Sequence, residues 1–553
     1  MLIPFLNFSY LSAEISAAKS ITENIYDGIV CIAHSLSETG KYEVLKPLLP
    51  SLLVYSQIHK DIENTTTLIL VDGDILPSRK LIFAGTGPVN RDYDDVRRFG
   101  IAARNGMKLA LKSGMKAPLI LTLPHEKYPQ AELVSALGAM HELYVPLNVR
   151  EEEKKTKVDT VGFYTLNYDQ KLSFGFLKYP KRGGEKGGER GRMNFQTLVK
   201  LVKALDAAFT VCRDIGDSDP QRMSPSNVAE YITNAFNGTN ITTHITSDVT
   251  EIEREFPLMA AVNRAANNVK NHQAHLIWLE YNPEGPCDET IMLVGKGVTI
   301  DTGGADLKTN GAMFGMCRDK YGAAVVAGIF KALEILKPRN IKFCGYMCMV
   351  RNSIGSNSYT CDEIIRSRSG KRIAICNTDA EGRITMLDPL TKMVELAKLE
   401  KKPRLFTLAT LTGHCILSYG YMAAAMDNGP ARKNHTAETI RGWGDAFGQP
   451  VEISRLHWED FEFHEAESEA ADIRQSNTLP SVRTLRGHQG PAAFLLKGSR
   501  LDEHGCDSQT PIAYTHIDMG ECMGSHPKAS YPNPLLALAA TYIFPHTNLS
   551  FKM

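Results

Sequence analysis

The chain has 553 residues, of which 43% are hydrophobic and 22% are charged, which excludes both a small disulfide-stapled scaffold and a largely disordered protein. Its 62 Lys and Arg residues balance 62 Asp and Glu residues, so the formal charge is zero. This neutrality excludes a protein that binds nucleic acid or an anionic membrane through its whole surface. We therefore expect no nucleic-acid partner and no membrane partner.

Cysteine usage and the N-terminal segment indicate the compartment. Eleven cysteines without a repeating spacing do not form a disulfide framework, which favours a reducing environment. The segment Met1–Leu11 lacks a basic region and contains Pro4 and Asn7, so we expect no signal peptide. No uninterrupted apolar run approaches the ~20 residues that span a bilayer. The sequence thus predicts a cytoplasmic protein.

The first third of the chain alternates short apolar runs with helical patterns. Apolar residues recur at helical spacing over Asp92–Ser113, between two strand-like runs. This order of strand, helix and strand predicts an N-terminal α/β domain over residues 1–190. The expected strands of this domain are Gly28–Ala33, Thr66–Val71, Leu81–Ala84 and Pro118–Leu123.

A glycine-rich, charged segment at Lys178–Arg192 ends this domain. Its composition is typical of a solvated linker or loop insertion. The alternative is a phosphate-binding loop, but the Gly-Lys-Ser/Thr ending that such a loop requires before a helix is absent. We therefore expect the domain boundary here, with residues 195–553 forming a second domain.

The second domain also alternates strands with helices, which predicts a larger α/β unit. Helical patterns cover Phe195–Val211, the region around Ala323–Leu336 and the region around Thr385–Leu399. The expected strands are His275–Glu280, Ile291–Ile300, Ile341–Met349 and Leu405–Ala409.

One of these strands carries unusual polar residues. The run Val-Gly-Lys-Gly-Val-Thr-Ile-Asp-Thr-Gly-Gly at 294–304 places Lys296 inside a strand that should be buried and Asp301 at its carboxyl end. Asp319 follows at the start of a helix. Ligands bind at the carboxyl ends of strands in open α/β sheets. The alternative is that the buried lysine and aspartate form only a structural ion pair.

A second unusual run, Asn-Thr-Asp-Ala-Glu-Gly-Arg, lies at 377–383, between a strand-like segment and a helix. If this run is extended, Asp379, Glu381 and Arg383 point to one side because side chains alternate along a strand. These charges could instead line a solvated strand face, but the small residues between them and the apolar flanks favour burial.

Together the two runs supply four carboxylates, from Asp301, Asp319, Asp379 and Glu381. Clustered anions repel one another, whereas two divalent cations would neutralise all four. Carboxylate oxygens suit Zn²⁺, Mn²⁺ or Mg²⁺, and two ions about 3.5 to 4 Å apart need carboxylates that contact both. Lys296 could act as a ligand only as a neutral amine, with its pKa lowered by metal and burial.

These motifs, with Ala-Thr-Leu-Thr-Gly at 409–413, resemble the leucyl aminopeptidase (cytosol aminopeptidase) family of two-metal exopeptidases. The resemblance covers the chain from about residue 195 to the C-terminus. The sequence of this region resembles a divergent animal branch of aminopeptidase-like proteins more closely than the best-known bacterial and mammalian enzymes. It implies a smaller N-terminal α/β domain followed by a larger α/β catalytic domain with a mixed central sheet flanked by helices. It also implies a peptide substrate and a homohexamer.

The resemblance implies a metal-binding role for each residue at five positions. Asp301 and Glu381 would bridge the two metals, Lys296 and Asp319 would complete the tighter site, and Asp379 would complete the more exchangeable one.

The resemblance also implies two catalytic side chains. Lys308 would polarise the scissile carbonyl, and Arg383 would hold a bicarbonate that acts as a proton shuttle. The chain departs from the family's usual pattern in the run Lys320–Ala324 after Asp319, at His414, where alanine is usual, and at Glu521, where glycine is usual, so a leucine preference is not implied. The pocket for the first side chain would be bordered by Met316, Thr410, Gly413, Gly520 and Met523.

The expected function is a metal-dependent aminopeptidase that removes the N-terminal residue from peptides with a free α-amine, with a metal-bridging hydroxide as nucleophile. One alternative is a catalytically weak or inactive family member that acts as a structural or binding hexamer. Another is a two-metal phosphohydrolase, although no phosphate-binding loop or additional arginine clamp is visible. The complete set of expected ligands, with Lys308 and Arg383, favours an active enzyme.

Overall fold

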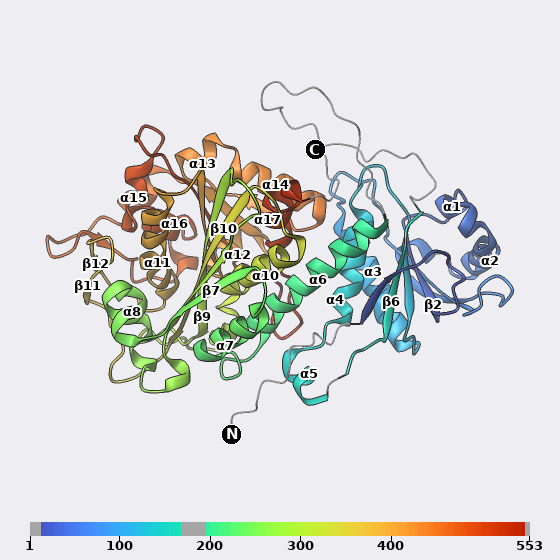
Figure 1. Ribbon diagram of the computed structural model, residues 1–553, viewed down its shortest axis with the longest axis horizontal. Helices are drawn as coiled ribbons and strands as arrows, with labels where there is room; N and C mark the ends of the chain where they lie inside the picture. The colour runs from blue at the N-terminus through green and yellow to red at the C-terminus, as the bar shows by residue number, and fades with distance from the viewer. Residues whose placement is uncertain (1–12, 154, 167–194, 548–553) are drawn as a thin grey trace. The chain divides into compact units, whose positions relative to one another are not determined.

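The computed structural model describes residues 13–153, 155–166 and 195–547. The glycine-rich segment at Lys178–Arg192 lies outside the described residues. The chain divides into two compact units (Figure 1), one of residues 1–207, 444–448 and 547–553 and the other of residues 208–443 and 449–546. Helices α6 (Phe195–Asp217) and α14 (Thr436–Phe447) contribute residues to both units.

The first unit is built on a six-stranded sheet in the order β1-β6-β5-β2-β4-β3, in which only β3 is antiparallel to its neighbour. Strand β2 is buried at every residue, as expected for a central parallel strand covered on both faces. The predicted strands are confirmed, and the predicted helix is confirmed as α3, which begins at Arg97 and not at Asp92. The elements are β1 (Glu14–Ala17), β2 (Gly28–Ala33), β3 (Thr66–Leu70), β4 (Lys80–Gly85), β5 (Pro118–Thr122), β6 (Thr160–Tyr164), α1 (Leu36–Thr39), α2 (Leu49–Ile58), α3 (Arg97–Lys112), α4 (Ala131–Leu143) and α5 (Leu147–Glu153).

The second unit is built on an eight-stranded mixed sheet in the order β15-β14-β17-β13-β9-β10-β8-β7. Strands β17, β13, β9 and β10 run parallel to one another at its centre, and β8 and β7 are antiparallel to their neighbours. This confirms the mixed central sheet that the family resemblance implies. Its strands are β7 (Ile241–Thr246), β8 (His275–Tyr281), β9 (Glu289–Asp301), β10 (Ile341–Asn352), β13 (Pro403–Ala409), β14 (Ala423–Asp427), β15 (Val451–Ile453) and β17 (Ala513–Asp518).

Helices cover both faces of this sheet, and β11 (Ile364–Arg366), β12 (Arg372–Ala374) and β16 (Ile473–Arg474) form a separate three-stranded sheet. The remaining helices are α7 (Pro225–Phe236), α8 (Val249–Glu255), α9 (Pro257–Asn263), α10 (Tyr321–Leu336), α11 (Glu381–Ala397), α12 (Gly413–Tyr419), α13 (Gly429–Lys433), α15 (Trp458–Glu462), α16 (Gln489–Gly498) and α17 (Leu535–Tyr542).

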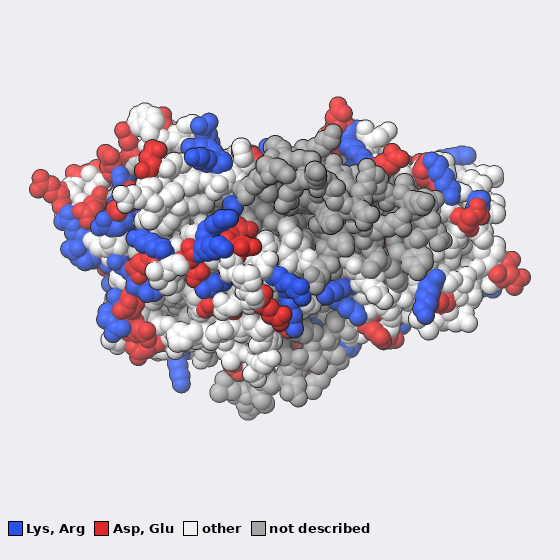
Figure 2. All heavy atoms as spheres, turned by 45° about the horizontal axis from the view of Figure 1, so that its top comes forward, with Lys and Arg blue, Asp and Glu red and all other residues white. Residues whose placement is uncertain are grey.

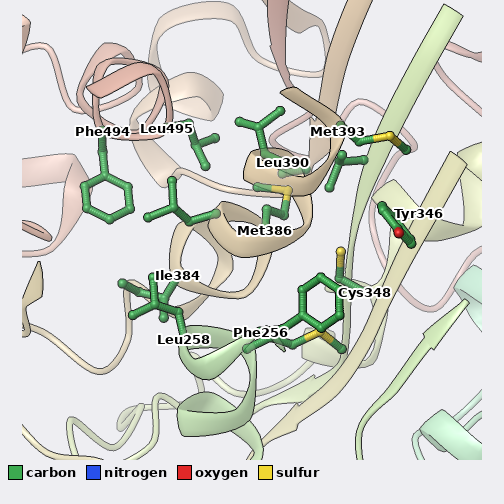
Figure 3. Packing of buried hydrophobic residues seen from close by; sticks show 14 of the residues in the cluster. Phe256, Leu258, Tyr346, Cys348, Ile384, Met386, Leu390, Met393, Phe494 and Leu495 are labelled. Carbon is green, nitrogen blue, oxygen red and sulfur yellow. The ribbon is translucent and has the colours of Figure 1, made fainter. Parts of the chain in front are cut away.

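Alternation along β9 and β10 sends neighbouring residues to opposite faces of the sheet. Gly295 and Gly345 face α10, since a Cβ on them would lie 2.6 Å from Ala323 and Phe330. The side chains that alternate with these glycines along β9 and β10 face α11, where they form one buried core (Figure 3). That core includes Met292, Val294 and Val298 of β9, Tyr346 and Cys348 of β10, and Met386, Leu390 and Met393 of α11. Lys296 extends from β9 on this same face, next to the start of α11.

The surface matches the neutral composition. On the face shown in Figure 2, basic and acidic side chains are interspersed and neither sign gathers into a large patch. Among the described helices, none combines the length and apolar character that crossing a bilayer requires.

Candidate active site

The predicted site residues gather at the carboxyl ends of the central parallel strands of the second unit. They line a cavity of about 850 Å³ that also includes parts of α12, α15 and the segment before α16. Asp301 ends β9, and Thr410 follows β13, so the topology brings them to one edge of the sheet. The predicted residues in the lining are Lys296, Asp301, Lys308, Met316, Asp319, Asp379, Glu381, Arg383, Thr410, Gly413 and Gly520.

Met523, the twelfth predicted residue, is not in this lining. Its side chain is 2% exposed, and its carbonyl accepts a hydrogen bond from the amide of Tyr531. Two of the residues that depart from the family's usual pattern, Glu521 and His414, lie differently. Glu521 lines the cavity, whereas His414 lies beside it and its Nδ1 is 2.7 Å from Nδ1 of His488.

Lys296 lies between two buried carboxylates. Its Nζ is 2.8 Å from Oδ1 of Asp319 and 2.8 Å from Oε1 of Glu381, and it donates to the carbonyl of Thr410 at 2.9 Å. The hydroxyl of Thr410 in turn donates to Oδ1 of Asp319. The buried lysine is therefore part of a charged centre that also includes Asp319, the residue after β13 and the first residue of α11.

Lys308 bridges the other two carboxylates. Its Nζ is 2.9 Å from Oδ2 of Asp301 and 2.5 Å from Oδ1 of Asp379. One oxygen from each of Asp301, Asp379 and Glu381 can be chosen so that all three lie within 4.8 Å of one another. The four carboxylates therefore hold two positive groups side by side in one cavity.

Burial and mutual repulsion shift the pKa values of this cluster. Burial raises the pKa of Asp319 well above its ordinary value, and burial together with Asp301 raises that of Asp379 to about 7. Burial lowers the pKa of Lys296 and Lys308, but the adjacent carboxylates outweigh it and raise both values. Lys296 is therefore an ammonium in this arrangement, and metal binding would have to remove its proton.

The expectation that residues 377–383 are extended is wrong. The segment turns after β12, and α11 begins at Glu381, so Glu381 and Arg383 lie in the first turn of a helix. A carboxylate in this position is favoured by the helix dipole. Asp379 lies in the preceding turn, where its amide donates to Oδ1 of Asn377 at 2.8 Å. The three charged side chains still line one cavity, but a turn and a helix start bring them there.

Gln475 holds this turn in place and was not predicted from the sequence. Its side chain accepts from the amides of Cys376 and Asn377 and donates to the carbonyls of Asn377 and Ala380. The side chain is fully buried and lies about a hundred residues away along the chain. Only the tertiary structure brings it next to the motif.

Asn352 orients the carboxylate of Asp301 and was also not predicted. It ends β10 directly beside Asp301, and its Nδ2 donates to Oδ1 of Asp301 at 2.8 Å. The amide of Gly303 donates to the same oxygen at 2.9 Å, which leaves Oδ2 facing Lys308. The sequence feature that could have indicated Asn352 is a polar residue at the end of an apolar strand.

Arg383 is buried in the wall of the cavity. Burial lowers the pKa of its guanidinium to about 10, against the opposing effect of Glu381 and Asp518, so it remains a cation at neutral pH. Its Nη1 donates to the carbonyl of Gln475 at 3.2 Å. Its Nε has no hydrogen-bond partner among the described residues, which leaves a donor for a small anion.

Gly382 is predicted to be essential for the position of Lys296. A Cβ at this position would lie 2.5 Å from Cε and 2.7 Å from Nζ of Lys296, which a close-packed site cannot accommodate without displacement. We expect Gly382→Ala to reduce kcat by at least ~10-fold and to destabilise the fold by about 1 to 3 kcal/mol.

Steady-state kinetics and thermal unfolding measure these two effects. Gly505→Ala is the matched control, because a Cβ there would meet nothing nearer than 3.9 Å. Equal activity of the two variants would contradict the steric argument.

The residues present fit divalent cations. Lys296 and Lys308 each occupy a place where two carboxylates hold a positive group, and Oδ2 of Asp319 is buried without a hydrogen-bond partner among the described residues. Such an orphaned carboxylate oxygen is costly unless a cation or donor reaches it. A set of clustered carboxylates is also the donor chemistry that Mn²⁺, Mg²⁺ and Zn²⁺ accept.

Comparison with known proteins shows the family to which the chain belongs. The model of the cytosol aminopeptidase family, catalytic domain, matches residues 210–535. A protein of Caenorhabditis elegans, named as aminopeptidase W07G4.4, is 55% identical over 540 residues. The match covers 97% of this chain and 99% of that protein. A protein of Aquifex aeolicus named as a cytosol aminopeptidase is 38% identical over 182 residues, covering 32% of this chain and 36% of that protein.

Solved structures show the same fold. The apo structure of leucyl aminopeptidase from Trypanosoma cruzi matches with a TM-score of 0.75 at 18% identity, covering 97% of each chain. The bottromycin maturation enzyme BotP in complex with Mn matches with a TM-score of 0.70 at 18% identity, covering 93% of this chain and 98% of that one. The family model and the 55% identical relative together show that this chain belongs to the cytosol aminopeptidase family of metalloaminopeptidases.

Proposed function

We propose that the chain removes the N-terminal residue from peptides with a free α-amine and uses two divalent metal ions to do so. The observation that carries the proposal is the pairing of four carboxylates around two positive groups inside one cavity. Once Lys296 gives up its proton to act as a ligand, the Lys308 ammonium and a single divalent ion supply three positive charges against four carboxylates, so mononuclear binding would leave one negative charge uncompensated.

This geometry and the family resemblance support the following ligands. Asp301 and Glu381 would contact both ions, Lys296 and Asp319 would complete one site, and Asp379 would complete the other. We propose Zn²⁺ or Mn²⁺ as the native ions, with Mg²⁺ as the third candidate. When bound, the ions supply Lewis acidity that lowers the pKa of water towards neutrality and polarises a carbonyl.

The protein's own residues then orient the substrate. Oδ2 of Asp319 is an available acceptor for the α-amine, and an anchor of this kind requires an unblocked N-terminus. Lys308, as an ammonium, would donate to the carbonyl oxygen of the first peptide bond as negative charge develops there. Arg383, with a free Nε, would hold a bicarbonate that moves a proton between the nucleophile and the leaving amine.

The proposal extends to assembly and compartment. Family resemblance supports a homohexamer, in which enclosed sites would admit peptides and exclude folded proteins. All eleven cysteines are free thiols, which supports the cytoplasm as the working compartment.

Removal of metal followed by reloading tests the two-ion proposal without relying on turnover. We expect elemental analysis of the protein reloaded with Mn²⁺ or Zn²⁺ to give two ions per chain. Because only one site includes Lys296, the other ion should exchange first during dialysis. A single tight ion per chain at saturating metal would contradict the two-metal arrangement.

The reaction is tested with a dipeptide in its free-amine and N-acetylated forms. We expect the metal-loaded protein to cleave the free-amine form and to leave the acetylated form intact. Equal cleavage of both would exclude an amine anchor, and absence of turnover with two ions bound would favour a non-catalytic member of the family.

A further inference from the structure

We propose that Glu521 makes this cavity select peptides that begin with arginine or lysine. The inference rests on the proposed aminopeptidase function and deepens it by naming the substrate class. Glu521 lines the same cavity as the four clustered carboxylates, but it is not one of the expected metal ligands.

Backbone pairing places Glu521 on the side of the cavity where the α-amine would bind. Strand β17 ends at Asp518, which is paired with Ala409 at the end of β13, and the amide of Met519 donates to the carbonyl of Ala409 at 2.7 Å. The turn that carries Glu521 therefore leaves the sheet beside Thr410. Since Thr410 contacts both Lys296 and Asp319, this turn lies on the Asp319 side of the cavity.

The walls beside Glu521 suit a long, unbranched side chain with a charged end. Met316 and Ile416 line the cavity with apolar atoms, and Gly520 presents no side chain. Gly520 has a φ of +46°, and a Cβ there would lie 3.2 Å from Cγ1 of Ile416, so the conformation and the limited space both favour glycine. Arginine and lysine bury their methylene stems on such apolar surface while the cationic end reaches a polar group.

The charge of Glu521 is not compensated within the described structure. Its half-buried side chain makes no ion pair or hydrogen bond with any described residue. By contrast, Asp460 in the same cavity already binds Arg486 through two contacts of 2.7 and 2.9 Å. A partly desolvated carboxylate gains most from a cationic hydrogen-bond donor, and a guanidinium can bind it through two parallel hydrogen bonds.

The other cations of the cavity are engaged elsewhere. In the metal-loaded protein Lys308 would contact the carbonyl of the first peptide bond, and Arg383 donates to the carbonyl of Gln475 and would hold bicarbonate. An N-terminal glutamate or aspartate would therefore meet the uncompensated charge of Glu521 and be repelled. The cavity should rank basic first residues above neutral ones, and neutral ones above acidic ones.

The test compares kcat/KM for coumarin amides of arginine, lysine, leucine and glutamate, using the full-length, metal-loaded protein. We expect Glu521→Gln to reduce kcat/KM for the arginine and lysine amides by about 10- to 100-fold, the size expected for a lost charge-assisted hydrogen bond. The leucine amide should change less than about threefold. Glu521→Lys should reverse the order of the arginine and glutamate amides.

Glu462→Gln is the matched control, because Glu462 lines the same cavity but is exposed to solvent. This variant should leave the arginine-to-leucine ratio unchanged. If the wild type cleaves the leucine amide and Glu521→Gln does not alter that ratio, the role of Glu521 is wrong while the aminopeptidase function stands.

Binding of the product amino acid distinguishes a failure of the specificity inference from a failure of the proposed aminopeptidase function. The affinities of free L-arginine and L-leucine for the metal-loaded protein can be measured by calorimetry, whether or not the protein turns substrate over. Tighter binding of arginine that is lost in Glu521→Gln supports the inference even without turnover. Equal affinities of the two amino acids in the wild type would overturn it.

Discussion

Replacing Asp301 by alanine is expected to release at least one metal ion and to lower kcat below about 1% of the wild-type value. Asp301 is the carboxylate with the most fixed orientation in the cluster, because Gly303 and Asn352 both donate to its Oδ1 and leave Oδ2 towards Lys308. Changes in residues that merely orient a ligand cost 10 to 100-fold in metal affinity, so loss of a bridging ligand should cost more.

Elemental analysis and kcat, measured on the same preparation, test this result. Asp507→Ala is a suitable control, because Asp507 is exposed and does not line the cavity. Asp301→Asn should resemble Asp301→Ala, since it keeps an oxygen for Gly303 and Asn352 but removes the charge. Retention of two ions and near-normal kcat by Asp301→Ala would show that this carboxylate does not bind both metals.

Much of the site could be predicted because the sequence breaks local rules there. Strand β9 is buried along almost its whole length, yet it contains Lys296 and ends at Asp301. A buried cation and a buried anion are unfavourable without partners, so their presence in an apolar strand indicates a site at its carboxyl end. The structure places both residues in the cavity lining.

The local conformation of the second motif could not be predicted in the same way. The alternation argument assumed an extended chain over residues 377–383, whereas α11 begins at Glu381. The residue before it, Ala380, makes no side-chain cap, so the usual helix-start signal is weak. Gln475 supplies the missing hydrogen bonds to this turn from a distant part of the chain. A pattern within seven residues carries no information about such a contact.

The residues predicted to border a pocket for the first side chain show a similar limit. Met523 follows Glu521 by two residues, but the amide of Cys522 donates to the carbonyl of Met519 and turns the chain between them. Glu521 consequently lines the cavity while Met523 is buried outside its lining. Proximity in sequence to a site residue therefore did not decide which side chain reaches the cavity.

Replacing Lys308 by methionine is expected to separate catalysis from metal binding. Lys308 interacts with Asp301 and Asp379, and these carboxylates raise its pKa, so it is an ammonium at neutral pH. If both carboxylates bind metal ions instead, the ammonium repels those ions and contributes nothing to holding them. Its use must then lie in contacting negative charge that appears only in the transition state.

Loss of one such donor lowers kcat by about 10² to 10³-fold, which corresponds to about 2.7 to 4 kcal/mol. Two ions per chain should remain in Lys308→Met, because the removed charge opposes metal binding. The matched control is Lys342→Met, since Lys342 also lies between two carboxylates, those of Glu280 and Glu400, but outside the cavity.

The comparison of Lys308→Met with Asp301→Ala then distinguishes the two roles. The lysine variant should lose turnover and keep metal, whereas the aspartate variant should lose both. Near-normal kcat in Lys308→Met with two ions bound would exclude this lysine as the donor to the developing oxyanion. Loss of metal from Lys308→Met would instead mean that its ammonium supports the ligands, as its present contacts with Asp301 and Asp379 allow.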